Sequence, residues 1–414
     1  MLNERHLSVR ASVIGLSFAV LTTVATIGVR AQAPATRPAP GAGRGGQFGA
    51  PPVRSPEVGA DKTVTFRLRA PNATAVTVRG LTRQPLLMQK DATGVWSATT
   101  APLKPDLYPY SFDVDGLSIL DPSNTRFSSS YRRIGQNVVL VPGDMPWTPL
   151  PNVPRGVVSR HVFQSKIAED ERDFYVYTPP NYDSKRGQPY PVLYLHHGWL
   201  QDTNAWLEDG AANVTLDTLI NQGKAVPMII VMPHAYGTAA GPVDIDREDM
   251  LPTYTRILLE ELIPQVEKQY NVATEPIGRA IAGLSMGGAE SMHTGLNHLE
   301  TFAWLGSFSG AYNTWPLTRP TENTATAGGP RFTLVESKLP AQFPKLDAKS
   351  NAQIKLLWIA CGTEDFGALP TNRQFKTYLD SKGVKVTYAE TPDIGHVWPF
   401  WRQNLADFAQ LLFK

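Results

Sequence analysis

A serine between two glycines, in Gly283-Leu284-Ser285-Met286-Gly287, carries the most specific chemical signature of this sequence. The spacing G-x-S-x-G is typical of a sharp strand-to-helix turn, and residues 280–283 and 289–296 have the matching apolar patterns. Glycines are needed there because the strand and the helix approach too closely for side chains. The turn lifts the serine hydroxyl and turns the next N–H toward it. We therefore expect Ser285 to be a nucleophile and the Met286 N–H to bind an oxyanion.

A serine hydroxyl is a weak nucleophile at neutral pH, so a base must take its proton and return it to the leaving group. His396 lies on a loop beyond the strand expected at 384–390, and Asp365 follows the buried strand expected at 356–361. The order serine, aspartate, histidine is that of α/β-hydrolases. We expect His396 to be the base and Asp365 to orient it. Glu364 and Asp393 remain rival acids.

A second oxyanion donor is expected where the buried run at 191–195 delivers His196-His197-Gly198-Trp199 to the carboxyl edge of a sheet. Gly198 lets the backbone turn the Trp199 N–H toward the carbonyl under attack. Adjacent strand residues point to opposite faces, so one histidine should pack and the other should line the edge. We expect structural roles for both histidines, no metal ligands and no cofactor.

Strands and helices must alternate to position these groups. From residue 159 to residue 414, short apolar runs bounded by turns alternate with segments of helical spacing. This pattern predicts a parallel sheet covered on both faces. Residues 61–142 instead contain short alternating strands with turn signals such as Asp115-Gly116, which predict a small all-β sandwich. The proline-rich stretch 143–158 is expected to be a linker.

The N-terminus has the pattern of an export signal. Residues 1–31 combine arginines, an apolar run and small residues before a cleavage site, which predicts a signal peptide. An uncleaved membrane anchor is the alternative. Residues 32–60 are rich in proline and glycine and are expected to be a disordered linker. The protein is therefore expected in the periplasm or outside the cell, with no membrane contact after cleavage.

The charge of the chain argues against nucleic acid as a binding partner. The net charge is only +2, and the sequence has no basic run.

The first domain resembles an early-set sandwich of the immunoglobulin-like type, classed with the family 48 carbohydrate-binding modules. The resemblance rests on 64–71, Gly94-Val95-Trp96, 108–116 and Leu120-Asp121-Pro122. It implies sugar binding through exposed aromatic side chains. A sandwich also needs a core, and we expect its aromatic residues to be core first, namely Phe66, Trp96, Tyr108, Tyr110 and Phe112.

The second domain resembles carbohydrate esterase family one, the feruloyl and acetylxylan esterases related to esterase D. The resemblance rests on 193–198, 278–288, 359–365 and 395–398. It implies an α/β-hydrolase fold and a serine esterase that removes acyl groups from plant cell-wall polysaccharide, with feruloyl groups on arabinoxylan as the leading substrate. Acetylxylan esterase and siderophore esterase of the enterochelin type are alternatives. An exported binding protein on an inactive hydrolase fold is a non-enzymatic alternative, disfavoured because no expected catalytic residue is missing.

Tryptophans are expected to bind the substrate. Trp206 and Trp315 lie on expected loops at the catalytic edge, and Trp398 follows His396 by two residues. Together with Trp199 they suit a planar phenolic ring, although each alone is more often packing. The expected partner is a plant polysaccharide or a small ester, and the oligomeric state stays open.

Overall fold

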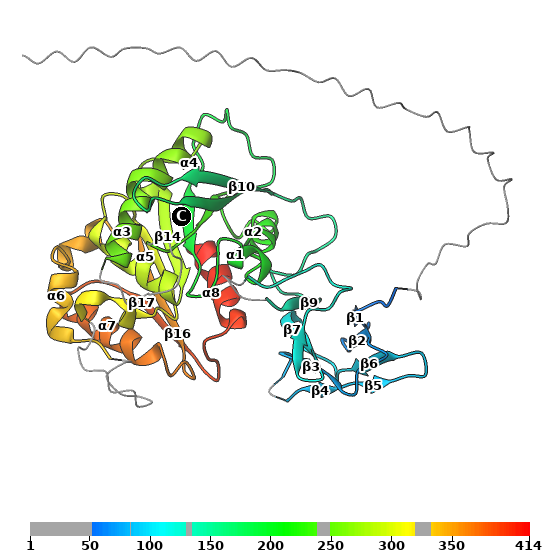
Figure 1. Cartoon of the computed structure of the whole chain (residues 1–414). Coiled ribbons are helices and arrows are strands. Elements are labelled where there is room, and N and C mark those ends of the chain that lie inside the picture. The colour runs from blue at the N-terminus through cyan, green and yellow to red at the C-terminus, as the bar shows by residue number, and fades with distance from the viewer. Residues whose placement is uncertain (1–51, 83, 130–134, 238–248, 319–332) are drawn as a thin grey trace, which may run out of the picture. The chain divides into compact units, whose positions relative to one another are not determined.

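The computed structural model describes residues 52–82, 84–129, 135–237, 249–318 and 333–414 (Figure 1). Residues 52–414 form one unit. The expected signal peptide and most of the linker at 32–60 lie outside the described residues. Among the helices that are described, none combines the length and the apolar character needed to cross a membrane.

The N-terminal region of this unit is all-β, as its alternating short strands predicted. It holds β1 (Glu57–Val58), β2 (Val64–Arg69), β3 (Val76–Arg79), β4 (Leu86–Leu87), β5 (Gln89–Lys90), β6 (Val95–Thr99), β7 (Asp106–Val114), β8 (Leu117–Ile119) and β9 (Asn137–Val141). One sheet has the order β1-β2-β6-β5 and the other β4-β3-β7-β8, with β9 paired to β7.

Aromatic residues fill the interior of this sandwich. Phe66, Tyr110 and Phe112 are fully buried and Trp96 is nearly so, while Tyr108 is half-buried and packs against the same cluster. The prediction that these residues form the core is therefore confirmed. The rings of the four buried residues are not free to stack on a sugar.

The predictions that residues 32–60 and 143–158 are linkers are each wrong in part. Strand β1 lies inside the segment assigned to the first linker and pairs with the start of β2. Two residues are too few to show alternation, so the sequence pattern could not reveal this edge strand. In the second linker Trp147 is buried against Leu107, Val138 and Ala211. A proline-rich segment can still be packed when it carries a large apolar side chain.

The C-terminal region is an α/β-hydrolase with one eight-stranded sheet of order β10-β11-β13-β12-β14-β15-β16-β17. Strands β10 and β11 are antiparallel to each other and β11 to β13, and the rest of the sheet is parallel. The strands are β10 (Val157–Gln164), β11 (Glu171–Thr178), β12 (Val192–His196), β13 (Ile229–Pro233), β14 (Arg279–Leu284), β15 (Trp304–Phe308), β16 (Leu356–Gly362) and β17 (Thr387–Thr391).

Helices cover both faces of this sheet. They are α1 (Ala205–Glu208), α2 (Ala212–Asn221), α3 (Met250–Arg256), the π-helical η1 (Ile257–Leu262), α4 (Ile263–Gln269), α5 (Met286–Asn297), α6 (Leu339–Gln342), α7 (Leu369–Ser381) and α8 (Trp398–Leu411). Short 3₁₀ turns are η2 (Pro276–Gly278), η3 (Tyr312–Thr314), η4 (Pro316–Thr318), η6 (Glu336–Lys338) and η7 (Ala348–Ala352). Helices α3, α5 and α7 pack on one face, and α2 and α8 on the other.

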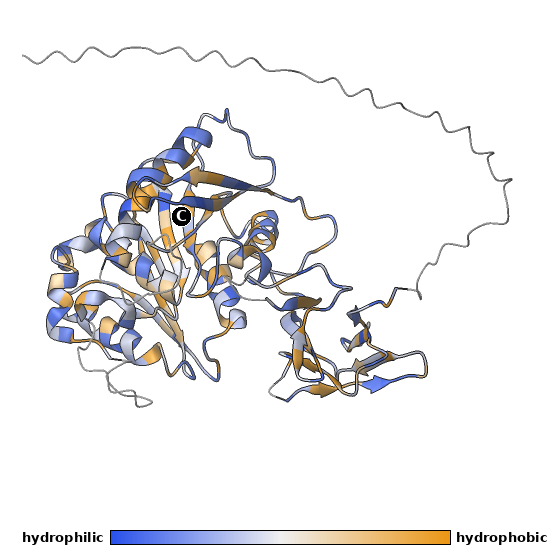
Figure 2. Ribbon diagram, viewed as in Figure 1, coloured by the Kyte–Doolittle hydropathy of each residue, from blue (hydrophilic) through white to orange (hydrophobic). Residues whose placement is uncertain are grey.

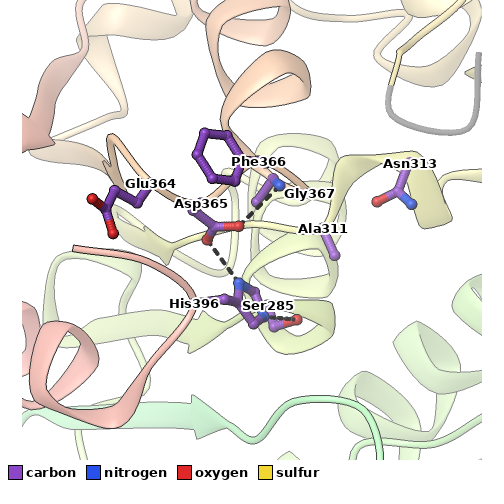
Figure 3. A pocket seen from close by; sticks show the side chains of 9 residues that line it. Ser285, Ala311, Asn313, Glu364, Asp365, Phe366, Gly367 and His396 are labelled. Atoms are coloured by element: carbon purple, nitrogen blue, oxygen red, sulfur yellow. Dashed lines mark hydrogen bonds and ion pairs between the residues drawn. The ribbon is translucent and has the colours of Figure 1, made fainter. Parts of the chain in front are cut away.

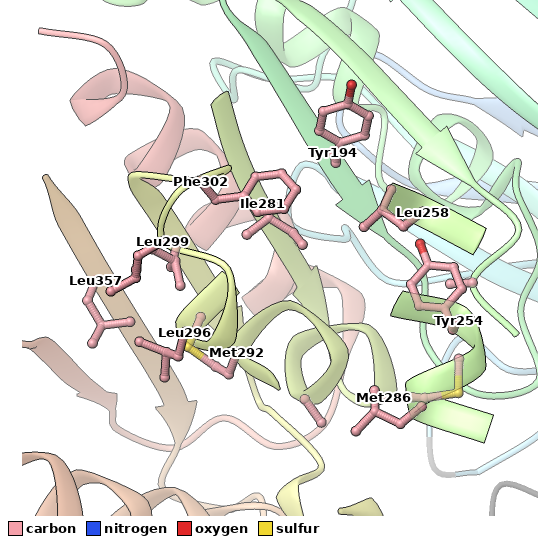
Figure 4. Packing of buried hydrophobic residues seen from close by; sticks show 14 of the residues in the cluster. Tyr194, Tyr254, Leu258, Ile281, Met286, Met292, Leu296, Leu299, Phe302 and Leu357 are labelled. Atoms are coloured by element: carbon pink, nitrogen blue, oxygen red, sulfur yellow. The ribbon is translucent and has the colours of Figure 1, made fainter. Parts of the chain in front are cut away.

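Alternate residues of the central strands face the two cores. In β14, Ile281 packs with α3 and α5, whereas Ala280 and Ala282 face α2 and α8. Figure 4 shows Ile281 beside Phe302 and Leu258, above the side chains of α5. Figure 2 shows the central strands mostly hydrophobic and hydrophilic stretches on the covering helices. Burial on both faces explains why these strands are continuous apolar runs, as expected for a parallel sheet.

Candidate active site

Ser285 occupies the turn between β14 and α5, with φ 53° and ψ −118°. A non-glycine residue in this region costs about 1–3 kcal/mol and persists only where its surroundings hold it. Here the Ser285 N–H donates to the Phe308 carbonyl at 2.9 Å, and the Ser285 carbonyl accepts from the Ala311 N–H at 2.9 Å. Hydrogen bonds on both sides thus fix the backbone from which the hydroxyl projects.

The glycines that flank the serine are required by space. A Cβ placed on Gly283 would lie 2.5 Å from the carbonyl carbon of Gly287 and 2.9 Å from the Cβ of His196. Contacts this short do not occur between real side chains and backbone atoms. The close approach of strand and helix that the sequence predicted is therefore present.

His396 lies between Ser285 and Asp365 (Figure 3). Its Nε2 is 3.0 Å from the Ser285 Oγ, and its Nδ1 is 2.7 Å from the Asp365 Oδ2. A carboxylate can only accept, so the proton of a neutral imidazole belongs on Nδ1. The lone pair of Nε2 then faces the serine hydroxyl.

Asp365 is buried, at 3% exposed. Burial alone would raise its carboxyl pKa, but hydrogen bonds from His396 and from the Ala368 N–H outweigh that effect and hold the pKa below its ordinary value. The group therefore stays a carboxylate. Of the rival acids, Glu364 and Asp393 are both exposed, and the described contacts of neither reach His396.

A cavity of about 390 Å³ opens beside the serine. It is lined by Ser285, Ala311, Asn313, Glu364, Asp365, Phe366, Gly367, Ala368 and His396. Figure 3 shows Glu364 and Asn313 on opposite sides of the line from Ser285 to Asp365. Phe366 is 77% exposed, which is unusual for so large an apolar side chain. The sequence did not predict Phe366 as a site residue, because residue type does not tell an exposed aromatic side chain from a buried one.

The sequence model of the esterase family matches residues 165–410, which are more than half of the 414-residue chain. The chain belongs to this esterase family. An endo-1,4-beta-xylanase/feruloyl esterase of Xylanibacter ruminicola is 28% identical over 367 residues, which are 87% of this chain and 46% of that protein. The chain thus spans about half the length of this curated relative.

Solved structures share the fold of this chain. A ferulic acid esterase of Anaeromyces mucronatus is 22% identical with a TM-score of 0.53, covering 66% of this chain and 96% of that one. The enterobactin esterase of Shigella flexneri is 18% identical with a TM-score of 0.59, covering 84% and 92%. At these identities the likeness shows the α/β-hydrolase fold, which the sequence predicted.

The turn at Gly198 lies directly beside Ser285. A Cβ on Gly198 would be 3.3 Å from the Ser285 Cβ and 2.6 Å from a methyl of Leu284. The next residue, Trp199, is 46% exposed. Met286 is the first residue of α5, and the first N–H groups of a helix have no acceptor within it. The two expected oxyanion donors therefore belong to segments that meet at Ser285.

Both histidines before Gly198 are buried and hydrogen-bonded within the protein, as expected for structural roles. The His196 Nδ1 lies 2.9 Å from the Ser291 Oγ, and burial lowers the pKa of this imidazole to about 3. The His197 Nε2 accepts from the Ala235 N–H at 3.1 Å, so its Nδ1–H donates to the Gly198 carbonyl at 2.8 Å. Neutral His197 thereby holds the turn. Within the described part of the chain, no group of three metal-binding side chains is arranged as a site.

Two of the expected substrate-binding tryptophans are core residues instead. Trp206 is 1% exposed and donates its indole N–H to the His196 carbonyl at 2.8 Å; Trp315 is fully buried and donates to the Ala289 carbonyl at 3.0 Å. Trp398 is half-buried, packs edge-on against Trp206, and is not among the cavity-lining residues. Trp206 lies in helix α1 and not on the expected loop. A position near the sheet edge does not fix the direction of a side chain, and the buried indoles of Trp206 and Trp315 each donate to a backbone carbonyl.

Trp315→Ala is expected to lower the free energy of unfolding by about 3–5 kcal/mol, because it empties a large volume in the core. Denaturant unfolding measures this loss, and Trp315→Phe should recover part of it. The KM of the folded fraction for a feruloyl ester should be unchanged. An increased KM at unchanged stability would show that Trp315 contacts the substrate and is not only a core residue.

Proposed function

We propose that this chain is an exported serine esterase that hydrolyses aromatic acyl esters of plant cell-wall polysaccharide, with feruloyl groups on arabinoxylan as the leading substrate. The proposal rests on His396, whose two ring nitrogens lie 3.0 Å from the Ser285 Oγ and 2.7 Å from the Asp365 Oδ2. Such an arrangement activates a serine for acyl transfer. The expected signal peptide at 1–31 supports export.

In the acylation half, the Ser285 Oγ attacks the ester carbonyl while its proton passes to the His396 Nε2. The carbonyl oxygen becomes an oxyanion, for which the N–H groups of Met286 and Trp199 are the proposed donors. Collapse of this intermediate breaks the bond to the sugar oxygen, which leaves with the proton from Nε2. Asp365 stabilises the imidazolium and keeps the Nδ1 proton directed toward itself.

In the deacylation half, a water molecule takes the place of the sugar hydroxyl. His396 removes a proton from that water, the resulting hydroxide attacks the acyl carbonyl, and the same two N–H groups hold the second oxyanion. The Ser285 oxygen then leaves with the proton from Nε2. The products are a free acid and the original enzyme, so no cofactor enters the balance.

An aromatic acyl group is favoured by the cavity and by the curated relative. The exposed ring of Phe366 offers an apolar wall beside the serine. Part of the xylanase/feruloyl esterase relative aligns with 87% of this chain, which supports a feruloyl ester. The near-zero net charge suits a neutral sugar polymer better than an anionic surface.

The deciding experiment is a hydrolysis panel of methyl ferulate, acetylated xylan and a catecholate siderophore trilactone. The proposal expects the highest kcat/KM on methyl ferulate, with ferulic acid also released from feruloylated arabinoxylan. Equal rates on acetyl and feruloyl esters would contradict an aromatic acyl site. Preference for the trilactone would make the chain a siderophore esterase.

Phe366→Ala is expected to lower kcat/KM for methyl ferulate by about 2- to 12-fold, corresponding to the ~0.5–1.5 kcal/mol that an aromatic pair contributes beyond area burial. Hydrolysis of an acetyl ester, which has no ring to stack, should be nearly unchanged. Phe366→Leu, which keeps an apolar side chain without a ring, separates stacking from mere hydrophobic contact. Equal losses on both esters would argue that Phe366 has no role in acyl recognition.

A further inference from the structure

A loop of the N-terminal sandwich hydrogen-bonds to the segment that follows the Gly198 turn. The Ser129 Oγ donates to the Asp202 Oδ1 at 2.9 Å and accepts from the Asp202 N–H at 3.1 Å. The Ser129 N–H donates to the Asp209 Oδ2 at 2.7 Å. One serine hydroxyl thus satisfies both the backbone and the side chain of Asp202.

The sandwich side of this contact is held in place by its own sheet. The Ser128 N–H donates to the Gln136 carbonyl at 2.7 Å, and the Gln136 N–H donates back to the Ser128 Oγ at 3.1 Å. The Val138 N–H, in β9, donates to the Arg126 carbonyl at 3.0 Å. Ser129 therefore projects from a segment fixed to strand β9.

On the other side, a short path leads from Asp202 to the nucleophile. Its neighbour Gln201 accepts the Gly198 N–H on Oε1 at 2.8 Å and donates its own N–H to the Gly198 carbonyl at 3.3 Å. Gly198 lies against Ser285, where an added Cβ would be 3.3 Å from the serine Cβ. The segment 198–202 is thus tied at one end beside Ser285 and at the other to Ser129.

A second contact fixes the same neighbourhood. Arg402, buried on α8, donates to the Asp209 carbonyl at 2.6 Å and to the Asp106 Oδ1 of β7 at 2.7 Å. Asp209 is also the residue that accepts the Ser129 N–H. The helix that carries Arg402 begins two residues after His396. The sandwich therefore touches both the segment beyond the Gly198 turn and the helix beyond the proposed base.

We propose that Ser129 is a positioning residue of the esterase reaction: through Asp202 it fixes the turn that presents the Trp199 N–H to the developing oxyanion. This inference rests on the proposed function, because it assigns the Trp199 N–H to the oxyanion. It gives the sandwich a part in the chemical step that is separate from any binding of sugar. Oxyanion donors act only when they are held where the charge develops, so a loosened turn lowers kcat.

The test compares Ser129→Ala with Ser118→Ala in the full chain. Both variants remove one hydroxyl, but in the described part of the chain the Ser118 Oγ donates to the Ser111 Oγ, within the sandwich and away from the segment that carries Ser129. Ser129→Ala should lower kcat for methyl ferulate about tenfold, a fraction of the 10²–10³ lost with a whole oxyanion donor. KM should change little, and Ser129→Thr, which keeps a hydroxyl, should recover most of the rate.

Two further readouts separate positioning from stability. An arylboronic acid, which forms a tetrahedral adduct, should bind Ser129→Ala about tenfold more weakly, whereas inhibition by ferulic acid should be unchanged. The double variant Ser129→Ala/Asp202→Ala should lose no more rate than the worse single variant. Both substitutions remove the bond between the Ser129 hydroxyl and the Asp202 carboxylate.

Equal kcat values for Ser129→Ala and Ser118→Ala would overturn the inference, as would additive losses in the double variant. Failure of the proposed function looks different, because wild-type protein would then be inactive on esters, or Ser285→Ala would be active. An active wild type with an inactive Ser285→Ala and an unaffected Ser129→Ala would reject only the positioning role.

Discussion

Ser285→Ala is expected to lower kcat/KM for methyl ferulate by about 10⁴ to 10⁶, since members of a serine triad act as a unit and removal of one leaves little of the others' effect. The substitution removes only the hydroxyl group, so His396 no longer has a serine proton to accept. Thermal unfolding and KM should stay close to wild type, because alanine keeps the backbone hydrogen bonds to Phe308 and Ala311.

Initial-rate measurements at high enzyme concentration resolve a loss of this size, provided that the variant is purified on unused resin to exclude wild-type carry-over. Ser118→Ala, a serine-to-alanine change in the sandwich, is the matched control and should keep full activity. More than a tenth of the wild-type rate in Ser285→Ala would show that another group is the nucleophile.

Asp365→Asn should lower kcat by about 10⁴, because an amide directed at Nδ1 favours the wrong imidazole tautomer and cannot stabilise its cation. Glu364→Gln and Asp393→Asn make the same chemical change on exposed acids next to the site and should stay near wild type. The opposite pattern, with Asp365→Asn active and one of the others inactive, would assign the orienting role to a different carboxylate.

The same substitution has a signature in the pH dependence of stability. The pKa of Asp365 is lower in the folded protein than its ordinary value. Its ionised form therefore stabilises the fold above the ordinary aspartate pKa, and this contribution is lost as the pH falls through the lower folded value. Asp365→Asn should lack that part of the acid destabilisation, which denaturant unfolding measured between neutral and acid pH can detect.

The groups near the nucleophile were predictable because each follows from a short sequence pattern or from its place at the end of a strand. One strand-to-helix turn leaves no space for a Cβ at the two glycines around Ser285, and the five-residue pattern G-x-S-x-G is enough to predict that turn. Asp365 and His396 follow strand ends, and the ends of parallel strands meet at one edge of a sheet. Strand order along the chain was thus enough to bring them together.

The tryptophans and the domain junction were not predictable in this way. Whether Trp206 and Trp315 face the cavity or the core depends on the helices packed against them. The position of a residue in the sequence does not determine that direction. Trp147 was assigned to a linker because prolines surround it, yet its partners Leu107 and Ala211 come from distant parts of the chain. Phe366 was overlooked since an exposed aromatic residue cannot be told from a buried one by type.

The nucleophile and the acyl-ester activity are tested together by covalent labelling with an aromatic fluorophosphonate. Ser285 should take up one phosphonyl group, located by peptide mass spectrometry, and hydrolysis of methyl ferulate should fall in proportion to the labelled fraction. Full labelling of Ser285 with hydrolysis intact, or loss of hydrolysis with the label on another residue, would contradict the proposal that Ser285 carries the acyl group.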